Sequence, residues 1–212
     1  MVIQGAEVAS TSPSGLNVRV VVRRHPYGHL LDAEAFAQLL WELGAHRAES
    51  IRAHHALDAA EAPRGVYPRD CLAMIVMDPT VGPWVDNVDA VMAAIVIGEG
   101  DYFLPNAAAK AGGHRRVGYD YGEAYITDPH LVAHGGFRHG HSARIRGVVV
   151  GASALNPDQD LYESAQLAAQ FVARIGDLHD DWTQRAGFGE WLSEGDVPDA
   201  ETRAMVRFAQ RL

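Results

Sequence analysis

The residues that decide the fold are 145–160, IRGVVVGASALNPDQD, an apolar run that leads into a strong helix start. The run is β-branched, which is typical of a central strand, and its two glycines allow another backbone to approach closely. Asn156 can then cap a helix, and Pro157 suits its first position. Asp158 and Gln159 suit the next two positions of the first helical turn. Apolar residues stay on one helical face up to Gly176. The stretch predicts a buried strand, over 145–152, followed by a long helix.

Strand-like and helix-like segments alternate along the rest of the chain. Apolar residues recur at every second position of 17–23, which predicts a strand with one buried face. The apolar run 71–77 predicts a buried strand. Asp32 is a good helix N-cap, and Gly44 lies where a helix commonly ends. The predicted helices cover 33–43, 49–61, 85–99, 157–175 and a segment starting near Asp199; 95–97 would also fit a strand, but we favour the helix. The alternation predicts an α/β or α+β fold.

These elements predict one domain with two terminal segments. Met1–Gly15 contains Ser, Thr and Gly and lacks periodicity, so we expect a flexible arm, or an arm that orders only against a partner subunit. Residues 16–176 form the expected α/β ligand-binding domain. Residues 177–212 form the expected C-terminal helical extension, packed on that domain.

Composition excludes several classes of protein. The net charge of -9 argues against nucleic acid or an anionic membrane as a partner, although the cluster at 113–116, GHRR, could hold one anionic group of a small ligand. A single cysteine, Cys71, excludes an intrachain disulfide framework and a CxxC site. Met1–Gly15 does not resemble a secretory signal, and the apolar run 91–97 is too short to span a bilayer. We therefore expect a cytoplasmic protein.

Residues 131–141, LVAHGGFRHGH, form the strongest candidate ligand site, because three histidines cluster beside a Gly-Gly pair. His139 and His141 form an H-x-H unit, and in an extended chain both imidazoles would lie on one face, as two ligands of one metal need. His134 would be a third ligand for a divalent transition metal such as Zn, Fe or Cu. A carboxylate ligand could come from the nearest acids, Asp120, Glu123 and Asp128. The alternative is an exposed, glycine-rich surface loop.

Acidic residues offer a second kind of chemistry. Glu99 and Asp101 flank a glycine directly after an apolar element, and two close carboxylates can divide into a general acid and a general base. The alternative is a turn with solvated acids. Glu123 and His134 are further candidates for acid–base catalysis. The chain contains no G-x-S-x-G elbow, no P-loop and no G-x-G-x-x-G helix start, and no Ser/His/Asp arrangement follows from the sequence alone.

Several segments resemble the GlcG/HbpS-like haem-binding family, which carries a Gly-Gly turn, a Gly-rich strand running into a small-residue loop, and a helix opened by Gln-Asp. The matching segments are Tyr125–Pro129, Gly135–Phe137, Ile145–Ser153 and Asp158–Asp160. This chain has Arg138 where the family has proline after the Gly-Gly turn. The resemblance implies an antiparallel, profilin-like sheet with packed helices, assembly into a homo-oligomer, and haem or a related tetrapyrrole as ligand. His134, His139 and His141 would then be axial-ligand candidates, and Arg115 or Arg138 would bind a propionate.

The sequence is compatible with three functional hypotheses. The first is a protein that binds haem or another planar cofactor through the histidine cluster. The second is an enzyme of lyase, isomerase or hydrolase type, which acts on a small organic substrate through histidines with a metal or beside carboxylates. The third is an assembly or regulatory subunit whose histidines are merely exposed.

Overall fold

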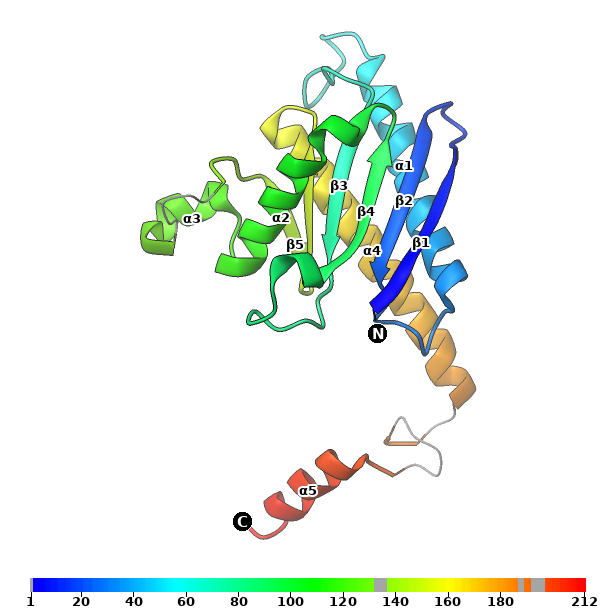
Figure 1. The fold of residues 1–212 in the computed structure, drawn as a ribbon, viewed down its shortest axis with the longest axis vertical. Coiled ribbons are helices and arrows are strands. Elements are labelled where there is room, and N and C mark those ends of the chain that lie inside the picture. The colour runs from blue at the N-terminus through cyan, green and yellow to red at the C-terminus, as the bar shows by residue number, and fades with distance from the viewer. Residues whose placement is uncertain (1, 132–136, 187–188, 192–196) are drawn as a thin grey trace. The chain divides into compact units, whose positions relative to one another are not determined.

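The computed structural model describes residues 2–131, 137–186, 189–191 and 197–212, and the chain divides into two compact units, Met1–Ala173 and Arg174–Leu212. The first unit holds a six-stranded antiparallel sheet in the order β1-β2-β4-β3-β6-β5 (Figure 1). The strands are β1 (Val2–Thr11), β2 (Asn17–Arg24), β3 (Leu72–Met77), β4 (Val91–Ile97), β5 (Ser142–Ile145) and β6 (Val148–Ser153).

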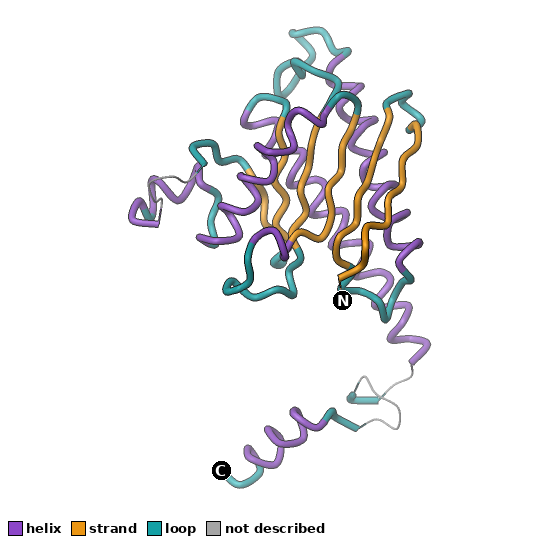
Figure 2. Tube along the Cα trace, in the orientation of Figure 1, coloured by secondary structure: helices purple, strands orange, loops and turns teal. Residues whose placement is uncertain are grey.

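Helices pack on both faces of this sheet, with α2 on one face and α1 and the beginning of α4 on the other (Figures 1 and 2). The α-helices are α1 (Ala33–His55), α2 (Leu104–Val117), α3 (Tyr121–Thr127), α4 (Pro157–Ala186) and α5 (Ala200–Ala209). Short 3-10 helices are η1 (Asn87–Ala90), η2 (Gly100–Phe103) and η3 (Pro129–Leu131). The predicted α+β class, an antiparallel sheet with packed helices and a C-terminal helix, is confirmed.

Several elements lie where helix caps and residue alternation predict them. Asp32 caps α1, because its carboxylate accepts a hydrogen bond from the amide of Ala35 at 2.8 Å. Asp199 caps α5 in the same way through the amides of Glu201 and Thr202. The alternating residues of β2 place Val18, Val20 and Val22 in the core, as their spacing predicts.

Two predictions about the N-terminal third are wrong. Residues 2–11 are not a flexible arm, because their backbone pairs with β2 within the same chain as strand β1. Gly44 does not end a helix either, since α1 continues through it to His55 and includes part of the second predicted helix. A Cβ at Gly44 would lie 2.9 Å from Val18 and 3.0 Å from Ile95, so this glycine lets α1 approach the sheet closely.

Three further predictions need correction. Residues 85–99 do not form a helix: they contain η1 and β4, and β4 lies between β2 and β3 with most of its residues buried, so it lacks the polar alternation of a one-sided strand. The predicted strand 145–152 is part of a hairpin, because β5 and β6 are joined at Arg146 and Gly147, whose φ angles are 47° and 87°. Helix α4 continues beyond Gly176 to Ala186.

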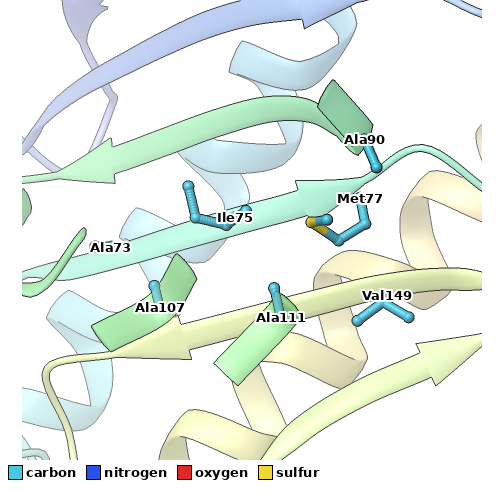
Figure 3. Packing of buried hydrophobic residues seen from close by; sticks show 7 residues of the cluster. All are labelled: Ala73, Ile75, Met77, Ala90, Ala107, Ala111 and Val149. Carbon is cyan, nitrogen blue, oxygen red and sulfur yellow. The ribbon is translucent and has the colours of Figure 1, made fainter. Parts of the chain in front are cut away.

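Small side chains let α2 pack closely against β3 and β6. Figure 3 shows the buried cluster at this contact, which comprises Ala73, Ile75, Met77, Ala90, Ala107, Ala111 and Val149. A Cβ at Gly151 of β6 would lie 2.5 Å from the carbonyl oxygen of Ala107 and 2.6 Å from the amide nitrogen of Ala111, so only glycine fits there. This contact fixes how far α2 lies from the sheet. Within the described part of the chain, no helix has both the length and the apolar character needed to cross a bilayer.

Candidate functional site

The last turn of α2 carries His114, which is buried at 5% relative exposure. One turn earlier, the ammonium of Lys110 donates to the carbonyl oxygen of Ala152 at 2.9 Å and to the carboxylate of Asp160 at 2.7 Å. These contacts tie α2 to the end of β6 and to the beginning of α4. His114 is therefore held by the same packing that builds the core.

A tight connection between α2 and α3 brings Asp120 back toward His114. Gly118 closes α2 with a φ of 83°, which favours glycine, and Asp120 then caps α3 by accepting from the amide of Gly122 at 2.8 Å. The other carboxylate oxygen of Asp120 accepts from both the amide and the hydroxyl of Ser142, each at 2.8 Å. Asp120 thus joins the beginning of α3 to the beginning of β5.

The hydroxyl of Ser142 also lies 2.8 Å from Nδ1 of His114. A serine hydroxyl carries one hydrogen, and here that hydrogen is donated to Asp120. Nδ1 of His114 must therefore carry a proton and donate it to Ser142. In the neutral ring this leaves a lone pair on Nε2, which makes no hydrogen bond within the described residues. The arrangement is a histidine–serine–aspartate chain with serine in the middle.

The environment favours neutral His114 and ionised Asp120. Burial lowers the pKa of His114, and the nearby charge of Arg144 lowers it further, while the Asp120 carboxylate opposes them. Burial by itself would raise the pKa of Asp120, but hydrogen bonds from Ser142, His141 and Gly122 outweigh it, so the pKa lies below its ordinary value. At neutral pH the lone pair on Nε2 is therefore free to accept a proton or to bind a metal.

His114 lines two adjacent pockets. The first, which we call the loop pocket, is a cavity of about 490 Å³ between residues 77–84, the end of α2, and Arg144, Gly147 and Val149. The second, the α3 pocket, has a volume of about 620 Å³ and is lined by His114, Asp120, Glu123, His141–Arg144 and Asp158. His114, Gly118 and Arg144 belong to both pockets. Both pockets are thus adjacent to His114.

The structure separates the two histidines of the H-x-H unit. His139 is exposed and, with Arg138, lines a third cavity of about 610 Å³, which we call the α2 pocket, whereas His141 lines the α3 pocket. His141 has a φ of 70°, so the segment is not extended and its alternate residues do not share a face. His134 lies outside the described residues. Among the residues that the structure describes, no group of three or more His, Cys, Asp or Glu side chains could hold a metal ion.

The remaining predicted site residues fall in different places. Glu123 lies in the α3 pocket with His114. Glu99 and Asp101 are exposed at η2, where Asp101 forms an ion pair with Arg19, and neither lines the loop, α3 or α2 pocket. Arg115 lines the loop pocket, but its guanidinium donates to the carbonyl oxygens of residues 81, 82 and 85 and to the side chain of Asn87. Arg115 therefore holds the pocket wall in place.

The sequence did not reveal the histidine–serine–aspartate chain, because its members come from α2, from the N-cap of α3 and from β5. The cluster at 113–116 predicts only a possible anion site, and no motif includes Ser142, which directly follows the H-x-H unit. In comparisons with known proteins, no family model, curated protein or solved structure matches this chain. The fold and the site therefore define the protein only as an α+β protein with a buried histidine at the wall of two pockets.

Proposed function

We propose that this protein is an enzyme that acts on a small organic substrate, and that His114 is its general base. The observation that carries the proposal is the hydrogen bond from Nδ1 of His114 to Ser142, since it leaves a lone pair on Nε2 of a residue that lines two pockets. Nε2 accepts a proton from the substrate, and the bonding electrons stay on the substrate. The imidazolium that forms is stabilised through Ser142 by the carboxylate of Asp120.

The hydrogen bonds give Ser142 a positioning role and not the role of a nucleophile. A nucleophilic serine donates its hydroxyl hydrogen to the histidine, which then removes it. Here the hydroxyl hydrogen of Ser142 is donated to Asp120, and the histidine is a donor. Proton transfer of the kind used by lyases and isomerases therefore fits the geometry better than acyl transfer through a serine.

The first experiment tests the base directly. Wild-type protein is incubated in D2O with a panel of small 2-oxo acids, aldehydes and ketones, and exchange of the hydrogens next to the carbonyl is followed by NMR. We expect exchange with at least one compound, its loss in His114→Gln and its retention in the control His139→Gln. The base removes a C–H proton, the electron pair moves into the carbonyl as an enolate, and a deuteron returns to carbon. Exchange that persists in His114→Gln would contradict the proposal.

A second measurement needs no substrate. In protein labelled with ¹⁵N, the shifts of the imidazole nitrogens distinguish a proton on Nδ1 from a proton on Nε2. We expect the Nδ1–H form for His114 at neutral pH, because Nδ1 donates to Ser142. An Nε2–H form or a doubly protonated ring at His114 would rule it out as the base.

The α2 pocket supports a second candidate function, the binding of haem or another planar cofactor. Phe137, Arg138 and His139 line it from one segment of the chain, and small residues of α2 line it as well. These α2 residues are Ala108, Ala109, Gly112 and Gly113. We propose that His139 would be the axial ligand and that Arg138 and Arg116 would bind the propionates. A Soret band that appears on haem addition and is lost in His139→Ala, but not in His114→Gln, would support this function.

A further inference from the structure

The loop pocket carries an excess of positive charge in an acidic chain. It is lined by Arg115, Arg116 and Arg144, while the net charge of the whole chain is -9. Asp78 is the acidic residue among the described residues that line this pocket, and it forms an ion pair with Arg24 at 2.8 Å. Two donors of Thr80, its amide and its hydroxyl, also bind Asp78, at 2.8 and 2.6 Å. The three arginines are therefore not neutralised within the pocket.

Two of these arginines have donors to offer a ligand. Arg144 is exposed, and its guanidinium donates a long hydrogen bond of 3.4 Å to the carbonyl oxygen of Gly118, which leaves most of its planar fork free. Arg116 is exposed and uses one nitrogen to donate to the hydroxyl of Tyr121. Because a guanidinium can donate two parallel hydrogen bonds to a carboxylate or phosphate, such forks are suited to anionic groups.

The other residues that line the pocket are suited to an organic body. The apolar residues that line it are Met77, Pro79, Val81, Pro83, Trp84 and Val149, and Trp84 is 84% exposed. A volume of about 490 Å³ lies within the usual range for sites that bind small molecules. A ligand with both an anionic group and an apolar or aromatic part would contact the arginines and the apolar wall at once.

We infer that the loop pocket binds a small organic anion, with Arg144 and Arg116 holding its carboxylate or phosphate oxygens and Trp84 contacting its apolar body. This inference rests on the proposed function, since it identifies the substrate class for the base His114 in the same pocket. The anionic group would fix the ligand in an orientation that leaves a neighbouring atom at the imidazole.

Binding is tested by titration calorimetry with phenylpyruvate, phenyl phosphate, inorganic phosphate and the neutral benzyl alcohol. We expect an aromatic anion to bind more tightly than the alcohol, with an affinity that falls as salt is added. The choice between phenylpyruvate and phenyl phosphate tells whether the pocket prefers a carboxylate or a phosphate. Binding of benzyl alcohol as strong as that of both aromatic anions, or binding of inorganic phosphate alone, would overturn the inference.

Arg146 provides a matched control, because it is an exposed arginine of the same hairpin that does not line the loop pocket. We expect Arg144→Gln to weaken binding of the preferred anion by about tenfold or more, as loss of a charge-assisted hydrogen bond does, and Arg146→Gln to leave it nearly unchanged. Equal effects of the two substitutions would mean that only the overall charge matters, which would overturn the inference.

The variant His114→Gln separates this inference from the proposed function. It keeps the arginines, so it should bind the anion while it loses proton exchange. If wild-type protein binds the anions but exchanges no hydrogens, the general base fails and the anion site stands. If neutral carbonyl compounds exchange through His114 and no anion binds, the base stands and the anion site fails.

Discussion

The ammonium of Lys110 lies 2.7 Å from a carboxylate oxygen of Asp160, and both side chains are almost fully buried, at 5% and 4% exposure. The second carboxylate oxygen of Asp160 accepts from the amide of Leu155 at 3.0 Å. This pair connects α2 to the start of α4. His114 depends on it, because α2 positions the imidazole.

Removal of one partner should be costly. We expect Lys110→Met to lower the free energy of unfolding by about 3–5 kcal/mol, because the Asp160 carboxylate would be left buried without a counter-charge. The double variant Lys110→Met/Asp160→Asn should recover part of this loss, since asparagine removes the charge and keeps an acceptor for Leu155. Urea unfolding at neutral pH measures both values. A double variant less stable than Lys110→Met would show that the buried charge is not the cause.

Two glycines should respond to alanine in opposite directions. We expect Gly151→Ala to destabilise the protein by about 1–3 kcal/mol, because the new Cβ would meet the backbone of α2 at 2.5 Å. Gly176 lies inside α4, and a Cβ added there would have nothing within 4 Å, so Gly176→Ala should stabilise that helix by about 0.5–1 kcal/mol. Thermal unfolding followed by circular dichroism compares the two. Equal tolerance at both positions would contradict the close contact between α2 and β6.

The pKa of His114 should shift in opposite directions when its two charged neighbours are changed. Asp120→Asn removes a carboxylate that raises this pKa, so the pKa should fall further below its ordinary value of 6.5. Arg144→Gln removes a cation that lowers it, so the pKa should rise. Proton NMR of the imidazole over a pH series measures each value. Shifts of the same sign in both variants would show that these charges do not govern the site.

The low pKa of His114 also predicts how stability depends on pH. Because the folded pKa lies below 6.5, the unfolded chain binds the proton first as pH falls. The contribution of neutral His114 is therefore present above pH 6.5 and is lost as pH falls toward the folded pKa. Glutamine does not titrate, so the His114→Gln variant should lose less stability than the wild type as pH falls below 6.5. Urea unfolding at several pH values tests this, and an unchanged pH dependence in the variant would contradict it.

Elements with a strong local signal could be predicted from the sequence. The carboxylates of Asp32 and Asp199 cap helices through amides two or three positions further along the chain. Strand β2 has one buried face, which its alternation of apolar and polar residues predicts. Strand β4 could not be recognised in this way, because it is buried within the sheet and its pattern also fits a helix. Gly44 shows the same limit, since a glycine that ends a helix and a glycine that permits close packing look alike in sequence.

The candidate site was harder to predict than the fold. His114, Asp120 and Ser142 come together because Gly118 reverses the chain after α2 and β5 returns to the sheet beside β6. The spacing of His139 and His141 predicts a shared face only if the backbone is extended. The backbone is not extended there, because φ of His141 is 70°. Residues that come from three separate segments of the chain produce no motif or periodic pattern in the sequence.

The hairpin turn at Arg146 and Gly147 sets the register in which β5 pairs with β6, so that Ser142 lies opposite Gly151. Side chains alternate between the two faces of a strand, so a shift of one position would turn Ser142 to the other face of the sheet. A single residue gained or lost in the turn would thus disconnect His114 from Asp120 while every residue of the site kept its identity. The length of this turn therefore determines whether Ser142 can link His114 to Asp120, although the turn itself contributes no residue to that chain.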